Sequence, residues 1–157
     1  MSTAAPATLD HAGIAARIPH AGRMCLLDAL LAWDATQIRC RAGDVHDPAH
    51  PLRDADGLSA AAGIEFAAQA MALHAGLAAP PGTPPRPGFL ASARQVRLHV
   101  ARLDDAAPPV SVSATRLVGD DGQAIYAFAL HDGAGRPLVD GRAAVVLDHP
   151  LTAPEAA

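Results

Sequence analysis

The chain has 157 residues, the size of one ordinary domain, and a formal net charge of −4 with a pI near 6.0. This charge and the lack of an arginine-rich segment argue against nucleic-acid binding, and no uncharged run is long enough to span a membrane. The N-terminus has no signal-peptide pattern, so we expect a cytoplasmic protein. Because only 3% of the residues are aromatic, its core must consist of small and aliphatic side chains.

The first predicted elements are two strands that form a hairpin. Residues 24–33 are almost entirely apolar, and residues 37–42 alternate apolar and polar side chains, with a turn expected near Asp34. Cys25 and Cys40 lie in these segments without metal-ligand spacing. The pattern favours free, buried thiols in a reducing compartment over a disulfide.

A long helix is predicted after a polar loop. Residues 46–57, "HDPAHPLRDADG", are rich in proline, glycine and aspartate and form the loop. Residues 60–77 are rich in alanine, with Ser59 available as the N-cap and Pro80 beyond the end. Apolar residues occur on every side of this helix, so we expect the rest of the domain to enclose it.

Four strand-like segments follow, and they complete the predicted fold. They comprise residues 95–100, 110–118, 124–131 and 137–147. The order of elements predicts an α+β protein with the hotdog fold, in which an antiparallel sheet, its last four strands in a meander, wraps around one long central helix. We expect a single domain over residues 1–157, with an ordered core over about 12–148 and a loose tail over about 149–157. Sheets of this kind commonly pair at an edge, which predicts a dimer.

Glu65 is the charged residue that stands within the apolar helix. An enclosed carboxylate must be hydrogen-bonded, paired, protonated or open to a cavity, because desolvation of the free charge is costly. Gln69 follows one helical turn later, so the two polar side chains share a face. This placement favours a functional pocket; the alternative is that Glu65 lies where the helix meets solvent.

The loop histidines His46 and His50 are the expected partners of Glu65, because a loop just before a helix can fold back over its first turns. A histidine near its usual pKa accepts a proton at neutral pH, and a desolvated glutamic acid donates one. His20, before the first strand, could reach the mouth of a pocket, although a structural role is favoured. Pro48 lies between the loop histidines and no third ligand has suitable spacing, so we predict no metal site.

Arginines gather around the first of the four late strands. The cluster consists of Arg86, Arg94, Arg97 and Arg102. Such clusters are usually solvated, but this one could also bind an acidic protein or a phosphate-bearing group.

The sequence as a whole resembles the hotdog-fold 3-hydroxyacyl-[acyl-carrier-protein] dehydratases, in particular those of aryl polyene pigment clusters. The resemblance rests on the segments "IPHAGRMCLLD", "WDATQIRC", "DPAHPLR", "GIEFAAQAMALHAGL", "RPGFLASARQVRLHVARLDD" and "PLVDGRAAVVL". It covers nearly the whole chain. It implies dehydration of 3-hydroxyacyl thioesters to trans-2-enoyl thioesters in fatty-acid or polyketide biosynthesis.

The resemblance also implies roles for individual residues. In the family, a loop histidine removes the α-proton of the substrate and a helix carboxylate protonates the leaving hydroxyl. Here the carboxylate matches Glu65, and the histidine matches His50 or, as in the aryl polyene group, the earlier His46. Gln69 matches a glutamine that positions the carboxylate, and Ala60 replaces a glycine whose backbone N–H contributes to an oxyanion hole.

The implied partners are an acyl carrier protein with a phosphopantetheine-bound acyl chain and a second hotdog chain, in a homodimer or in a heterodimer with a related dehydratase. No cofactor is implied. Two alternatives remain open: a hotdog acyl thioesterase, in which the helix carboxylate activates water, and a non-catalytic subunit that supports an active dehydratase. The chain has "AHPLRDADGLSA" in place of the family's glycine- and proline-rich loop, which favours the second alternative.

Overall fold

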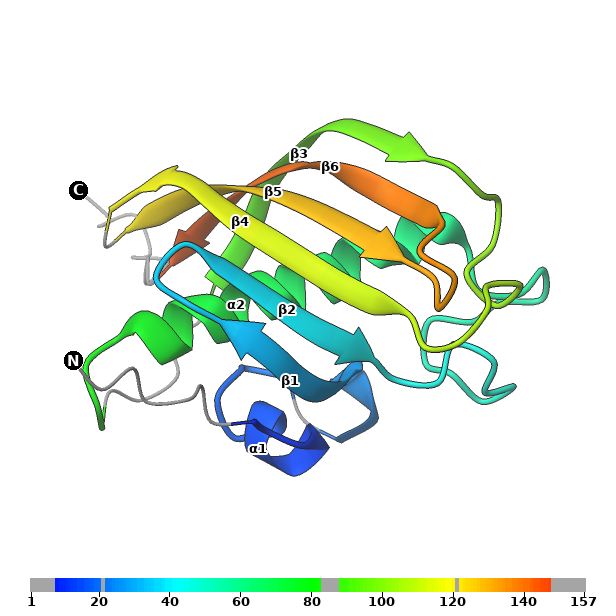
Figure 1. Ribbon diagram of the computed structural model, residues 1–157, viewed down its shortest axis with the longest axis horizontal. Helices are drawn as coiled ribbons and strands as arrows, with labels where there is room; N and C mark the ends of the chain where they lie inside the picture. The colour runs from blue at the N-terminus through cyan, green and yellow to red at the C-terminus, as the bar shows by residue number, and fades with distance from the viewer. Residues whose placement is uncertain (1–7, 21, 83–87, 121, 148–157) are drawn as a thin grey trace, which may run out of the picture.

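One antiparallel sheet of six strands curls around the helix α2 (Gly63–Ala78) in the computed structural model, which describes residues 8–20, 22–82, 88–120 and 122–147 (Figure 1). The strands are β1 (Leu27–Trp33), β2 (Gln37–Ala42), β3 (Gly88–Leu98), β4 (Ser111–Gly119), β5 (Gln123–His131) and β6 (Pro137–Leu147). Their order in the sheet is β1-β2-β4-β5-β6-β3. A short helix α1 (His11–Ala15) lies beside β1, and a 3-10 turn η1 (Gly22–Met24) precedes that strand. The predicted arrangement of a sheet around one helix is confirmed.

The predicted meander of the last four strands is wrong in one respect. Strands β4, β5 and β6 follow one another in the sheet, but β3 pairs with β6 and not with β4. The connection from β3 to β4 therefore crosses the end of the sheet, where Ala101 and Leu103 bond to the segment that leads into α2. Strand β3 also begins at Gly88, several residues before the predicted start, and forms an edge of the sheet.

The predicted hairpin of β1 and β2 is confirmed. Leu30 pairs with Cys40 in this antiparallel pair, and the side chains that alternate inward from β2 are buried. Cys25 and Cys40 are both free and buried, as expected. Burial raises the pKa of the Cys40 thiol to about 12, so this thiol remains protonated and packs as an apolar group.

The start of the central helix is fixed by Ser59. This residue has an extended backbone, and its Oγ accepts the N–H of Ala61, which caps the 3-10 turn η2 (Ala60–Ala62) that runs into α2. Pro80 follows soon after the last helical residue. Both helix signals in the sequence therefore correspond to the observed ends.

The expected enclosure of α2 is incomplete. The sheet buries one side of the helix, including Phe66 and Met71. A strip along the opposite side is only half-buried and consists mainly of small side chains. It comprises Ile64, Glu65, Ala68, Ala72 and Ala75. This chain alone therefore leaves an apolar strip of its central helix uncovered, and we call it the open strip of α2.

A buried carboxylate ties the loop before α2 to the β3–β4 connection. Asp104 Oδ2 lies 2.6 Å from Nη2 of Arg102 and 3.2 Å from Nη1 of Arg53, and its Oδ1 accepts the N–H of Leu58. The bonds from Arg102 hold the pKa of the Asp104 carboxyl well below its usual range. The cluster fixes the start of η2 and α2 relative to the sheet.

Within the described residues, no helix is long and apolar enough to cross a membrane. The predicted tail over 149–157 lies outside the described residues.

Candidate active site

Glu65 lies in the first turn of α2 on the open strip, with 37% of its side chain exposed. The carboxylate is therefore neither enclosed by the sheet nor free in solvent. Its Oε1 lies 3.1 Å from Nε2 of His20 and 3.3 Å from Nε2 of Gln69. Three side chains from two distant parts of the sequence thus meet around one carboxylate oxygen.

Gln69 is completely buried and joins α2 to the segment that enters β1. Its Oε1 accepts the N–H of Leu26 over 2.8 Å, and its Nε2 donates to the carbonyl of Met24 over 2.7 Å. A backbone N–H can only donate, so the amide oxygen must face Leu26 and the NH₂ group must face Met24 and Glu65. Both hydrogens of that group are used, and the second one fixes the position of Glu65 Oε1.

His20 comes from the segment just before η1, and 30% of its side chain is exposed. Its Nε2 faces Glu65, while Nδ1 is buried and has no hydrogen-bond partner among the described residues. Nε2 is therefore the ring nitrogen of His20 that can exchange a proton with a neighbouring side chain, the carboxylate of Glu65. The sequence segment "IPHAGRM" drew attention to His20, but the expectation of a structural role missed its contact with Glu65.

The two oxygens of Glu65 have different surroundings. Oε1 contacts both His20 and Gln69, whereas no hydrogen bond or ion pair from the described residues reaches Oε2. In a carboxylate held in this way, the oxygen without protein partners is the one that remains available to a bound molecule.

His50 does not contact Glu65 within this chain, contrary to expectation. His50 as a whole is 8% exposed, and its ring stacks on Phe66 with 5.7 Å between ring centroids, while its Nδ1 accepts the N–H of Leu52. A neutral imidazole has one lone pair, and in His50 this lone pair is used by the backbone. Burial also lowers the pKa of His50. These contacts suit a residue that holds the loop against α2.

His46 does not contact Glu65 in this chain either. Its side chain is exposed, and its Nδ1 lies 3.6 Å from Oδ1 of Asp44, which also accepts the His46 backbone N–H. The expectation that the loop folds back over the helix is correct, but in this chain it brings Phe66 and His50 together and not Glu65 and a histidine.

The backbone N–H of Ala60, the expected oxyanion donor, is hydrogen-bonded within this chain. It donates to the carbonyl of Ala101 over 3.0 Å. The next two N–H groups, of Ala61 and Ala62, bond to Ser59 Oγ and to the Ser59 carbonyl. The first donors of the η2–α2 segment are therefore all used by the protein itself, because the β3–β4 connection lies against the start of η2.

Comparison with solved structures places this architecture in the hotdog class, as predicted. The dehydratase heterocomplex ApeI:P from Xenorhabdus doucetiae is 21% identical, with 87% of this chain and 91% of that chain covered and a TM-score of 0.72. A thioesterase from Haemophilus influenzae is 11% identical over 78% of each chain, with a TM-score of 0.56. The Escherichia coli PaaI protein is 8% identical over 74% of this chain and 80% of that chain, with a TM-score of 0.54. At these identities the similarity establishes the fold alone.

The particular family follows from the sequence match. The ApeP-like family, described as ApeP dehydratase, matches residues 12–153. The chain therefore belongs to the ApeP-like dehydratase family, and the resemblance to dehydratases of aryl polyene type is confirmed. A search of curated proteins gave no match.

Proposed function

We propose that this chain takes part in the dehydration of 3-hydroxyacyl thioesters on an acyl carrier protein, with Glu65 and His20 as the proton-transferring pair. The observation that carries the proposal is the 3.1 Å contact between Nε2 of His20 and Oε1 of Glu65 at the open strip of α2. Membership of a dehydratase family supports the class of reaction. The expected acidic role of Glu65 is kept, while His20 takes precedence over His50 and His46 as base.

The proton balance of the reaction suits such a pair. Elimination of water breaks the α-C–H bond and the bond from the β-carbon to the hydroxyl. The α-proton goes to Nε2 of His20 and the electron pair of the C–H bond forms the double bond, while Glu65 protonates the departing hydroxyl from Oε2. Imidazolium and carboxylate then face each other. The water that the elimination releases carries one proton from Nε2 of His20 to Oε2 of Glu65, which restores both groups.

Gln69 supports this chemistry as a positioning residue. Because its amide is held by the backbone of Met24 and Leu26, its remaining N–H fixes Oε1 of Glu65 and leaves Oε2 toward the substrate. The segment that carries His20 leads directly into the same backbone stretch. One buried amide therefore fixes Glu65 relative to the backbone that follows His20 in the sequence.

The acyl chain would lie along the open strip of α2. Ala68 and Ala72 continue the strip from Glu65 with side chains small enough to leave room for a thin apolar ligand. A second hotdog chain would close the other side of this space and exclude water. The heteromeric assembly of the ApeI:P dehydratase favours a related dehydratase as that second chain.

The test measures enoyl product by mass after incubation with a 3-hydroxyacyl carrier protein, using the chain alone and with a related dehydratase partner. Glu65→Gln and His20→Asn should each abolish most of the activity, by about a hundredfold or more, whereas His99→Gln on the other face of the sheet serves as control. The proposal is wrong if Glu65→Gln retains full dehydration. If His50→Ala or His46→Ala loses activity while His20→Asn keeps it, the general base is that loop histidine and not His20.

The non-catalytic subunit is the second candidate, and a specific observation favours it. The N–H groups at the start of η2, including that of Ala60, are all hydrogen-bonded within the chain, which favours a subunit without an oxyanion hole of its own. In this case only the mixture with a partner is active, and Glu65→Gln in this subunit changes nothing.

The thioesterase is the third candidate, since Oε2 of Glu65 has no partner among the described residues and could activate water. Release of free carrier thiol without enoyl product in the same assay would identify it.

A further inference from the structure

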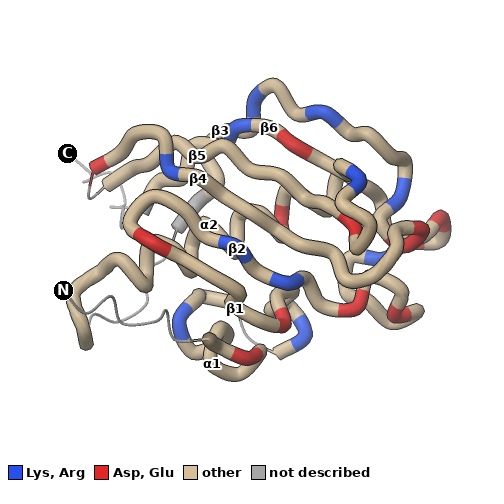
Figure 2. The backbone as a smooth tube through the Cα atoms, viewed as in Figure 1, with Lys and Arg blue, Asp and Glu red and all other residues tan. Residues whose placement is uncertain are grey.

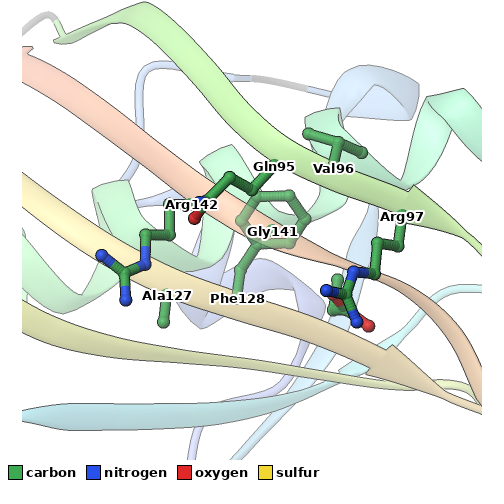
Figure 3. A pocket seen from close by; sticks show the side chains of 8 residues that line it. Gln95, Val96, Arg97, Ala127, Phe128, Gly141 and Arg142 are labelled. Atoms are coloured by element: carbon green, nitrogen blue, oxygen red, sulfur yellow. The ribbon is translucent and has the colours of Figure 1, made fainter.

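Three arginines border two adjoining hollows on the face of the sheet that is turned away from α2. Phe128 of β5 is buried against the core, so its neighbour Ala127 and the Ala127 partner Arg142 face outward. Arg97, Arg142 and Gln95 line a hollow of about 580 Å³, which Figure 3 shows from close by. A second hollow, of about 430 Å³, adjoins it at Gln95 and Arg142 and includes Arg94. We call Arg94, Arg97 and Arg142 the arginine surface.

A β-bulge in the edge strand β3 creates this surface. Arg94 pairs with Arg142 and Arg97 pairs with Asp140, although two residues separate the arginines on β3 and only Gly141 separates their partners on β6. In a regular strand, residues three apart face opposite sides, whereas here the extra residue turns both arginines outward. The bulge has a strained backbone, since Gln95 has a φ of 53°.

Gly141 permits the bulge to lie close to β6. A Cβ added at Gly141 would be 3.1 Å from Cα of Val96 and 3.1 Å from Cζ of Phe128. The strained backbone of Gln95 and the glycine on the neighbouring strand therefore belong to the same β-bulge. This bulge places Arg94 and Arg97 on the same face of the sheet.

The charges of the arginine surface are not balanced within the described part of the chain. None of the three guanidinium groups has a carboxylate partner there, and Asp140, which lines the hollow, is bound through Oδ2 to Nε2 of His99 over 2.6 Å. Arg94 and Arg142 are direct cross-strand neighbours, and like charges in such positions destabilise a sheet. Figure 2 shows these basic positions along β3 and β6, in a chain with a net charge of −4.

Arg102, a member of the sequence cluster, does not extend this surface. It is paired with Asp104, and Arg86 lies outside the described residues. Arg142, which the sequence pattern did not include, is part of the surface because β6 lies next to β3 in the sheet.

We propose that the arginine surface binds a carboxylate-rich segment of a partner protein. The two arginines of β3 lie about 7 Å apart along the sheet, because their partners Asp140 and Arg142 on β6 are two residue steps apart, so the three groups suit several anions in a row. Ala127 and Ala144 line the two hollows together with the larger Phe128 and Ile125, so a partner segment meets apolar surface between the guanidinium groups. Guanidinium groups bind carboxylates in bidentate fashion. The surface lies on the face away from α2 and does not depend on the chemistry at Glu65.

A single phosphate group fits this surface less well. Phosphate sites in proteins commonly use converging backbone N–H groups, whereas the N–H groups of the central part of β6 take part in the sheet ladders with β3 and β5. The surface offers exposed arginine side chains in an open hollow.

The experiment measures the fluorescence anisotropy of a labelled peptide of alternating glutamate and alanine, titrated with the full chain at low ionic strength. Arg94→Gln/Arg142→Gln should weaken binding by about tenfold or more. The matched control Arg39→Gln/Arg41→Gln removes two exposed arginines from β2 and should change the affinity by less than about twofold. All four positions are exposed, and far-ultraviolet circular dichroism checks that the variants are folded.

Three outcomes would overturn the proposal. The first is no saturable binding of the peptide to the wild-type chain. The second is an equal loss of affinity in both double variants, which would indicate nonspecific charge attraction. The third is displacement of the peptide by inorganic phosphate but not by chloride at the same ionic strength, which would indicate a site for a small anion. Weakening by both salts to the same extent supports the proposal, because exposed charge pairs are screened.

Discussion

Gln69 donates a hydrogen bond to Oε1 of Glu65, one turn earlier on α2, while the rest of its amide is bound to the backbone before β1. The carboxylate is therefore positioned by the sheet as well as by its own helix. This relationship explains why a buried glutamine lies in an otherwise apolar part of α2.

Replacement of Gln69 by alanine should reduce both stability and activity. The variant leaves the N–H of Leu26 and the carbonyl of Met24 without partners, and an unpaired buried polar group costs about 1–3 kcal/mol. Urea unfolding measures this loss, and Gln123→Ala, at an exposed position of β5, serves as control. Unchanged stability in Gln69→Ala would show that water replaces the amide.

Replacement of Asp104 by asparagine should change the acid stability of the chain. The pKa of Asp104 is lowered in the folded state, chiefly by the hydrogen bonds from Arg102. Its stabilising effect is therefore present above the pKa of an unfolded aspartate, about 3.9, and is lost as the pH falls toward the folded pKa. The difference in unfolding free energy between wild type and Asp104→Asn should shrink below about pH 4. Asp105→Asn, at the exposed neighbouring position, serves as control.

His74 should make the chain less stable in weak acid. Its Nδ1 accepts from the hydroxyl of Tyr126 over 2.7 Å, its Nε2 donates to the carbonyl of Asp34 over 2.8 Å, and burial lowers its pKa. Below about pH 6.5 the unfolded histidine takes up a proton that the folded one excludes, at up to about 1.4 kcal/mol per pH unit. His50, whose pKa burial also lowers, contributes with the same sign.

The measurement is the free energy of unfolding between about pH 7.5 and 5.5, for wild type and His74→Gln. The variant should be less stable at the upper end but flatter across the range. An unchanged slope would mean that His74 is protonated in the folded chain.

Gly57→Ala should be more destabilising than Gly135→Ala. Both glycines have positive φ, of 107° and 82°, so both variants strain the backbone by about 1–3 kcal/mol. At Gly57 the new Cβ would also be 2.7 Å from Nε of Arg102 and from Oδ2 of Asp104, whereas at Gly135 nothing lies within 4 Å. Thermal unfolding of the two variants separates the effect of backbone strain, which both share, from that of the steric clash at Gly57. Equal losses of stability would contradict the close packing around Asp104.

Local patterns in the sequence predicted the hairpin, the Ser59 cap and the central helix, because each of these depends on residues close in the chain. The place of β3 beside β6 could not be predicted in this way, since it depends on a connection that crosses the sheet. The bulge at Gln95 has the same origin, because it exists only in relation to Gly141.

Of the candidate site, only the part that depends on local spacing in the sequence could be predicted. Glu65 and Gln69 stand out because their spacing on one helix is local. His20 reaches Glu65 through the fold of the segment before β1, a contact that no spacing indicates. The choice of His50 followed the proximity of its loop to α2, which is correct, but the ring contacts Phe66 instead.

The open strip of α2 also bears on how the stability of this chain should be measured. A partner subunit or acyl ligand that covers the strip binds the folded chain and not the unfolded one, so it shifts the unfolding equilibrium by mass action. A melting temperature recorded on the isolated chain is then a lower limit. In the assembled state the same chain becomes more resistant to heat as the concentration of its partner or ligand rises.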